Sequence, residues 1–163
     1  MIIKLKNKEN LIVKDFIFRC SIGKKGLKKY KIEGDKSTPS GNFKLGNLFY
    51  RADKVKKPET ILKCIKITKK MGWCNDSNSI SYNKKILINK NVSAEKLYRN
   101  DYKYNYFIDI KYNSKKIKPY RGSAIFIHLT KNYKPTAGCV ALKEKDFLIL
   151  AKLLNKNSRI LLN

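Results

Sequence analysis

His128 and Cys139 are the residues of this chain whose types and spacing fit chemistry best. His128 is the only histidine, and Cys139 follows it after a short loop, directly behind Gly138. A cysteine attacks as its thiolate, and free thiols are mostly protonated at neutral pH, so a catalytic cysteine needs a base nearby. Histidine suits that task because its pKa lies near neutrality. The pair indicates nucleophilic acyl transfer, although two ordinary buried side chains would give the same spacing.

Gly138 adds to the catalytic interpretation. A glycine lets the backbone turn tightly and lets a substrate approach closely. The consecutive N–H groups of Gly138 and Cys139 would then face the oxyanion that forms when the thiolate adds to a carbonyl.

The elements that must position this pair are mostly strands. Runs of β-branched and aromatic residues predict strands, and "NKEN" between the first two is a plausible hairpin turn. The strands are expected at residues 1–6, 11–22, 42–52, 61–68, 104–113, 123–129 and 158–163. The run at 123–129 is apolar until His128, so the imidazole is expected near the end of its strand.

Two helices are expected beside these strands. Phe147, Leu150, Ala151 and Leu154 fall at helical spacing within residues 143–157, which predicts an amphipathic C-terminal helix packed on the sheet. A short additional helix is expected at 93–99, capped by Ser93 with Glu95 in its first turn. Residues 72–85 are polar and are expected to form a loop.

The bulk composition indicates one globular domain spanning residues 1–163, of mainly β, that is β-rich α+β, class. The chain has 163 residues, no repeats and no linker-like segment. No run of 18 apolar residues predicts a membrane span, and the charged N-terminus does not resemble a signal peptide.

The net charge of +26 arises from 38 Lys and Arg against 12 Asp and Glu, and it suggests a polyanionic partner. The lysines are scattered along the chain, however, and arginine, the better residue for phosphate and guanine contacts, is scarce. Biased codon usage would give the same composition. Nucleic-acid binding is therefore not expected as the main function, whereas anionic cell-envelope polymers would use the charge equally well.

The other cysteines, Cys20, Cys64 and Cys74, form no C-x-x-C pair with each other or with Cys139. With a single histidine in the chain, no metal site is expected. Disulfides stay open, because four cysteines allow three pairings.

Residues 122–142, "GSAIFIHLTKNYKPTAGCVAL", resemble the L,D-transpeptidase catalytic domain, also called the YkuD-like domain. That family carries an upstream His and a downstream Ser/Thr-x-Gly-Cys, matched here by His128 and by Thr136-Ala137-Gly138-Cys139. "EGDKSTPSGNF" resembles the family's Gly-Asp-x-x-Thr-Pro-x-Gly-x-Phe loop, and residues 71–83 and 93–113 resemble one branch of the family. The likeness runs from about Cys20 to the C-terminus.

The resemblance implies a YkuD-like β-sandwich and peptidoglycan crosslinking without a cofactor or metal. Cys139 would attack the carbonyl of the L-centre of diaminopimelate in a donor tetrapeptide stem, releasing D-Ala, with His128 as base and then acid. The family normally works in the periplasm or cell envelope, although a cytoplasmic location stays open without a visible signal segment. A monomer is expected.

Two alternatives remain from the sequence. An L,D-carboxypeptidase or endopeptidase would use the same residues on the same stem peptides. A non-catalytic module of the same fold would bind the cell wall or another polyanion through its lysines.

The sequence departs from the commoner family pattern around the nucleophile. The His-to-Cys loop is shorter, Ala137 stands where many members have a second His, and the Arg that often follows the nucleophile is missing. A nearby Lys or Arg121 is the expected replacement for that Arg. A backbone carbonyl or the Thr136 region is expected to orient His128, with Asp76 as a weaker candidate. Trp73 and Tyr82 are candidates for the substrate groove, or are plain core aromatics.

Overall fold

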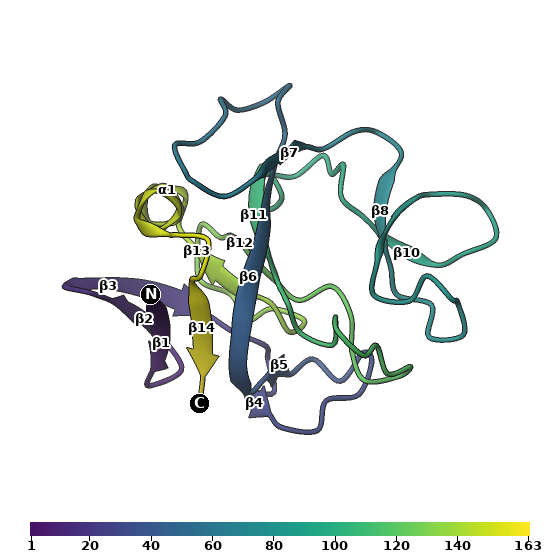
Figure 1. Ribbon diagram of the computed structural model, residues 1–163, viewed down its shortest axis with the longest axis horizontal. Helices are drawn as coiled ribbons and strands as arrows, with labels where there is room; N and C mark the ends of the chain where they lie inside the picture. The colour runs from purple at the N-terminus through teal and green to yellow at the C-terminus, as the bar shows by residue number, and fades with distance from the viewer.

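The computed structural model describes residues 1–163, and its long strand β6 (Gly41–Tyr50) joins the two halves of the main sheet (Figure 1). In sheet order the strands are β11 (Tyr106–Ile110), β12 (Phe126–Leu129), β13 (Val140–Leu142), β3 (Phe16–Ser21), β2 (Asn10–Val13), β1 (Ile2–Lys6), β14 (Arg159–Leu162), β6 and β7 (Cys64–Lys66). The first half of β6 pairs with β14 and the second half with β11, so the sheet curls round and closes on itself.

Two small sheets flank this frame. One has the order β10 (Ala94–Lys96), β8 (Met71–Cys74) and β9 (Lys85–Leu87), and the other pairs β4 (Leu27–Lys28) with β5 (Thr38–Pro39). Figure 1 shows β8 and β10 on the side of β6 that is opposite to helix α1 (Glu144–Leu153).

The β-rich class and the C-terminal helix are confirmed. Helix α1 lies within the predicted range and buries Phe147, Leu150 and Ala151. The prediction of a short additional helix at 93–99 is wrong. Residues 94–96 form strand β10 and pair with β8, so that Glu95 lies opposite Trp73. Ser93 donates its hydroxyl hydrogen bond to Asn75 instead of capping a helix. Strand β8 provides hydrogen-bond partners for the backbone of residues 94–96, and this tertiary pairing outweighs the weak helical propensity of the segment.

Two strand boundaries also differ from the sequence pattern. The expected strand at 11–22 divides into β2 and β3, which form a hairpin around Lys14, a residue with a positive φ of 51°. The expected loop at 72–85 begins as strand β8, which is the central strand of its sheet. The turn at "NKEN" is confirmed, since it joins β1 to β2.

Two hydrophobic clusters lie on opposite faces of β12 and β13. The main core contains 25 buried residues, mostly aliphatic, and includes the buried face of α1. The cleft cluster contains nine: Phe49, Ile67, Met71, Leu97, Tyr104, Phe107, Ala124, Phe126 and Cys139. Because side chains alternate along a strand, Ile127 and Leu129 enter the main core while Phe126 and His128 face the other way.

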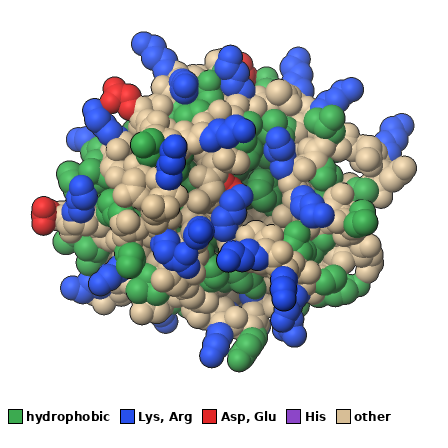
Figure 2. All heavy atoms as spheres, in the orientation of Figure 1, with side chains coloured by type: hydrophobic (Ala, Val, Ile, Leu, Met, Phe, Trp, Pro, Cys, Tyr) green, Lys and Arg blue, Asp and Glu red, His purple; other side chains and the backbone are tan.

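The surface is dominated by cations. Figure 2 shows Lys and Arg side chains spread over the visible face, with few carboxylates among them. All four cysteines are free, and no cluster of three or more His, Cys, Asp or Glu side chains is arranged to hold a metal ion. Helix α1 has neither the length nor the apolarity to cross a membrane.

Candidate active site

A cleft of about 600 Å³ opens over the cleft cluster. All four residues predicted to be catalytic line it: Thr136, Gly138 and Cys139 from the loop before β13, and His128 from β12. Strands β12 and β13 are parallel neighbours in which Ile127 pairs with Val140 and His128 with Ala141. This register brings His128 and Cys139, the residue directly before β13, to the same face.

Cys139 is held at the floor of the cleft with 8% of its surface exposed. Its thiol donates to the carbonyl of Ala124 at 3.3 Å, and its sulfur accepts the N–H of Phe126 at 3.3 Å. Burial, and then the charge of Glu95, raise the pKa of the Cys139 thiol to about 12, although the Phe126 N–H and Lys31 lower it in part. The Cys139 thiol is therefore neutral at rest.

His128 is also neutral at rest. Burial lowers the pKa of its imidazole to about 4, although the Leu129 carbonyl partly opposes this. Nδ1 lies 2.9 Å from that carbonyl, which can only accept, so the proton sits on Nδ1 and Nε2 carries the free lone pair. No hydrogen bond joins His128 to Cys139 in this resting arrangement. A backbone carbonyl thus orients the ring, whereas Asp76 forms no hydrogen bond with it.

The turn before Cys139 depends on Thr136 and Gly138. The Thr136 hydroxyl donates to the Cys139 carbonyl at 2.6 Å and accepts the N–H of Gly138 at 3.1 Å. Gly138 has φ 145°, and a Cβ there would lie 2.8 Å from the Ser37 carbonyl oxygen, so only glycine fits. Of the two N–H groups considered for the oxyanion, that of Gly138 is occupied by Thr136, whereas that of Cys139 has no acceptor in the protein.

Thr38 ties this turn to the loop that resembles the family's Thr-Pro motif. It is fully buried, and its hydroxyl accepts the N–H of Gly23 and donates to the Gly138 carbonyl, each at 2.8 Å. The hydrogen bonds make Thr38 a positioning residue for the nucleophile loop, because they fix the backbone one residue before Cys139.

Two carboxylates on the cleft wall were missed by the sequence. Tyr104 donates to Glu95, Tyr82 donates to Glu33, and neither carboxylate forms a salt bridge. Burial raises the pKa of Glu95, and Tyr104 and Arg99 counteract this in part. The Tyr104 ring also meets the His128 ring edge-on at 5.5 Å between centroids. The helix predicted at 93–99 did not indicate this contact. Glu95 lines the cleft because residues 94–96 form strand β10.

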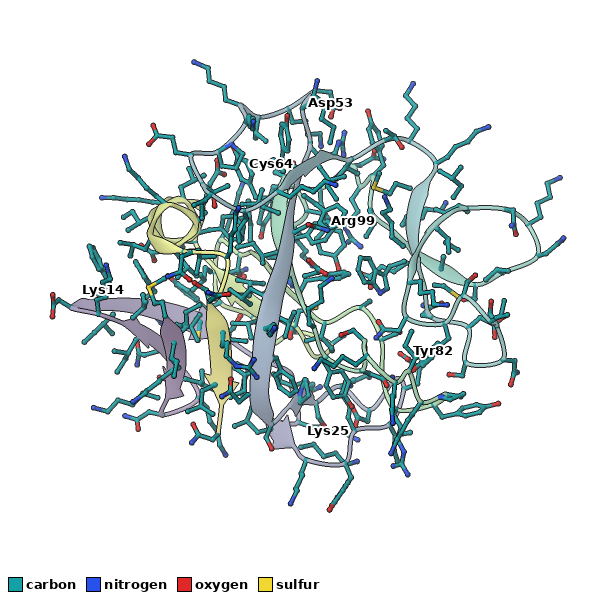
Figure 3. All side chains as sticks on the ribbon, viewed as in Figure 1. Lys14, Lys25, Asp53, Cys64, Tyr82 and Arg99 are labelled. Carbon is teal, nitrogen blue, oxygen red and sulfur yellow. The ribbon has the colours of Figure 1, made fainter.

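The four predicted substrate-binding residues do not line the cleft. Trp73 supports it from behind, packing edge-on against Phe126 at 5.1 Å between centroids. Tyr82 is buried and accepts the N–H of Gly122 while donating to Glu33. Asp76 caps its own turn by accepting the N–H of Asn78, and Arg121 is exposed. In Figure 3, Tyr82 lies on the same side of β6 as Arg99, which does line the cleft.

Comparison with known protein families gives a match that spans nearly the whole chain. The family model described as the YkuD L,D-transpeptidase catalytic domain matches residues 4–162. Comparisons with curated proteins and with solved structures found no match. The family is generally enzymatic and associated with the cell envelope. The chain belongs to the YkuD family of L,D-transpeptidase catalytic domains.

Proposed function

We propose that the protein is a peptidoglycan L,D-transpeptidase in which Cys139 carries the acyl group and His128 moves the protons. One observation carries this proposal: in a chain of this family, His128 on β12 and Cys139, directly before the neighbouring strand β13, line one cleft. The partner is a peptidoglycan stem peptide, the expected working place is the cell envelope, and the protein acts as a monomer.

In the first half-reaction the Cys139 sulfur adds to the carbonyl carbon of the L-centre of diaminopimelate. Nε2 of His128 takes the thiol proton as the C–S bond forms, since both groups are neutral at rest. The free N–H of Cys139 donates to the developing oxyanion. The C–N bond to D-Ala then breaks, the leaving amine takes the proton from His128, and a thioester remains on Cys139.

In the second half-reaction an amine from another stem adds to the thioester carbon. His128 takes a proton from that amine and returns it to the departing sulfur, so that a new amide and the free thiol are formed. Water in place of the amine would give a tripeptide and a carboxypeptidase outcome.

The surface charge supports a second role beside catalysis. Cations on the visible face would attract the protein to anionic polymers of the envelope (Figure 2). This attraction should weaken steeply with salt and should not depend on Cys139. A co-sedimentation assay on cell-wall sacculi at rising salt, with wild type and Cys139→Ala, tests it.

The experiment that tests the proposed reaction uses tetrapeptide muropeptides with wild type, Cys139→Ala and Cys64→Ala. Cys64 is the matched control, since it is a free, partly exposed thiol at the start of β7 (Figure 3) and does not line the cleft. An acyl adduct in the intact-protein mass, with D-Ala release, is expected for wild type and Cys64→Ala only. Crosslinked dimers identify a transpeptidase, and tripeptides alone identify a carboxypeptidase. A folded, reduced wild type without adduct or product would contradict the proposal.

A further inference from the structure

Lys31 is the only lysine of the chain that is buried, with 3% of its surface exposed, and it lines the cleft. Its ammonium group donates to Asp35 at 2.6 Å. Asp35 also accepts the N–H groups of Ile32 and Ser37, and Lys28 lies 3.5 Å from it on the exposed side. The carboxylate therefore holds Lys31 in place through a preorganised loop. An ammonium group has three donors, so two remain for other partners.

The backbone around Lys31 directs its ammonium toward the nucleophile. Its methylene groups pass over Gly122, where an added Cβ would lie 2.9 Å from Cε, and Gly122 has φ 93°. Its Nζ lies 3.5 Å from where a Cβ on Gly138 would be, one residue before Cys139. Lys31 is also one of the groups that favour the Cys139 thiolate. Two glycines thus leave the room in which a long cationic side chain reaches the site.

Ser123 supplies a second, independent observation on the same side of the cleft. It follows Gly122, lines the cleft and is 7% exposed, and its hydroxyl oxygen has no hydrogen-bond partner. A buried hydroxyl without a partner loses free energy unless a ligand or water completes it. A hydrogen-bond acceptor that enters the cleft beside Lys31 would satisfy it.

We propose that Lys31 and Ser123 form a carboxylate-binding subsite beside Cys139, which fixes the donor stem for acylation. This inference rests on the proposed function and names the group that would take over from the arginine missing after the nucleophile. The donor stem offers two carboxylates near the attacked carbonyl, the terminal one of the leaving D-Ala and the one on the diaminopimelate side chain. Either would find a buried cation and an unpartnered hydroxyl in the same cleft, because Lys31 passes over Gly122, the residue before Ser123.

The first test compares the acylation kcat/KM of wild type, Lys31→Met, Lys31→Arg, Ser123→Ala and Lys28→Met. Lys28→Met is the matched control, because it removes the same charge from the same Asp35 partner but lies outside the cleft. Lys31→Met should lose about 10- to 100-fold, as expected for a charged hydrogen bond, and Ser123→Ala about 3- to 10-fold. Lys31→Arg should recover part of the rate. Equal rates for Lys31→Met and Lys28→Met would overturn the inference.

Amidated substrates identify which carboxylate is bound. One donor carries a C-terminal carboxamide and the other carries an amidated diaminopimelate side chain. Wild type and Lys31→Met should become equally fast on the donor that has lost the recognised carboxylate, and should stay different on the other. A full Lys31→Met defect on both amidated donors would contradict carboxylate binding and leave Lys31 as a structural ion pair.

A second test does not require the proposed reaction. Iodoacetate and iodoacetamide alkylate the same thiol, but only iodoacetate carries a carboxylate, and peptide mass mapping reports the rate at Cys139. The iodoacetate-to-iodoacetamide rate ratio should be about 10-fold lower in Lys31→Met than in Lys28→Met, although both have the same net charge. An unchanged ratio would refute the subsite even if no stem peptide acylated the protein, whereas failed acylation with a lowered ratio would refute the proposed function alone.

Discussion

The main core and the cleft cluster lie on opposite faces of the same strands, β12 and β13, yet their compositions differ. The main core is mostly aliphatic and is closed by α1. The cleft cluster is built from stacked and edge-on rings, including the parallel pair of Phe49 and Phe107 at 4.6 Å between centroids. Rigid aromatic rings hold polar groups such as His128 in fixed positions, whereas aliphatic side chains fill volume.

Each cluster holds one buried cysteine, which makes the contrast direct. Burial raises the pKa of Cys20 in the main core and of Cys139 in the cleft cluster to about 12. The two thiols are therefore both buried and have similarly raised pKa values. Only Cys139 lines the cleft and has a histidine on the same face. The open cleft and the neighbouring histidine, more than the resting pKa, therefore distinguish the candidate nucleophile from a packing residue.

The largest expected effect comes from exchanging these two thiols for alanine. Cys139→Ala should reduce acylation by about 10⁴-fold or more, because no other group forms the thioester. Cys20→Ala should keep the acylation rate and lower the free energy of unfolding by about 1 kcal/mol. Intact-protein mass spectrometry and urea unfolding measure the two quantities on the same samples. Loss of acylation in a folded Cys20→Ala variant would contradict the assignment of acylation to the cleft cluster alone.

Phe147→Ala should have the next largest effect, on stability alone. Phe147 is fully buried in the main core and stacks on Tyr106 at 5.9 Å between centroids. Its truncation should cost about 3–5 kcal/mol of unfolding free energy, because a cavity is left behind. The acylation rate per folded molecule should remain close to wild type, as measured below the urea transition. A rate that falls in proportion to stability would show that the two faces are coupled.

His128 should make stability depend on pH. Its folded pKa of about 4 lies below the usual 6.5, so the unfolded chain binds the proton first as pH falls. The contribution of neutral His128 to the free energy of unfolding is fully present above about pH 6.5. It is lost as the pH falls toward 4, by at most about 3 kcal/mol. His128→Gln should show a flatter decline over this range in urea unfolding. Since the chain has no other histidine, parallel curves would refute the lowered pKa.

Thr38→Val should give the smallest effect, and it should change both the stability of the protein and the acylation rate. The substitution keeps the shape but leaves the Gly23 N–H and the Gly138 carbonyl without partners in a buried place. We expect a loss of about 1–3 kcal/mol in unfolding free energy and a lower acylation rate, with Thr38→Ser close to wild type. If Thr38→Val acylates as fast as Thr38→Ser, the anchor does not position the nucleophile loop.

The sequence predicted those parts of the fold that local patterns determine. The apolar run ending at His128 forms β12, and the helical spacing of Phe147, Leu150 and Ala151 forms the buried face of α1. Glu95 could not be placed, because strand β10 exists only through its pairing with β8. Such a pairing is a tertiary contact, and three residues are too few for an alternating apolar pattern that would predict a strand.

Lys31 and Ser123 show the same limit within the candidate site. One lysine in a lysine-rich loop looks like a solvated side chain, and nothing local distinguishes Lys31 from Lys28 or Lys29. Its burial depends on Gly122, which is far away in the sequence but adjacent in space. Trp73 and Tyr82 fall between these cases, since neither lines the cleft. Trp73 packs behind it on Phe126, and Tyr82 reaches its wall only through the hydrogen bond to Glu33.

The place of β14 between β1 and β6 has a consequence for how the protein is made. Ile2 is the register partner of Arg159, so β1 waits for a strand that is translated 157 residues later (159 − 2 = 157). Until then the edge of β1 that pairs with β14 has no partner strand. Such sequence separation slows folding, because a long loop must close before the pairing stabilises it. A nascent chain of this protein therefore completes its barrel-like sheet only after synthesis of β14 has ended.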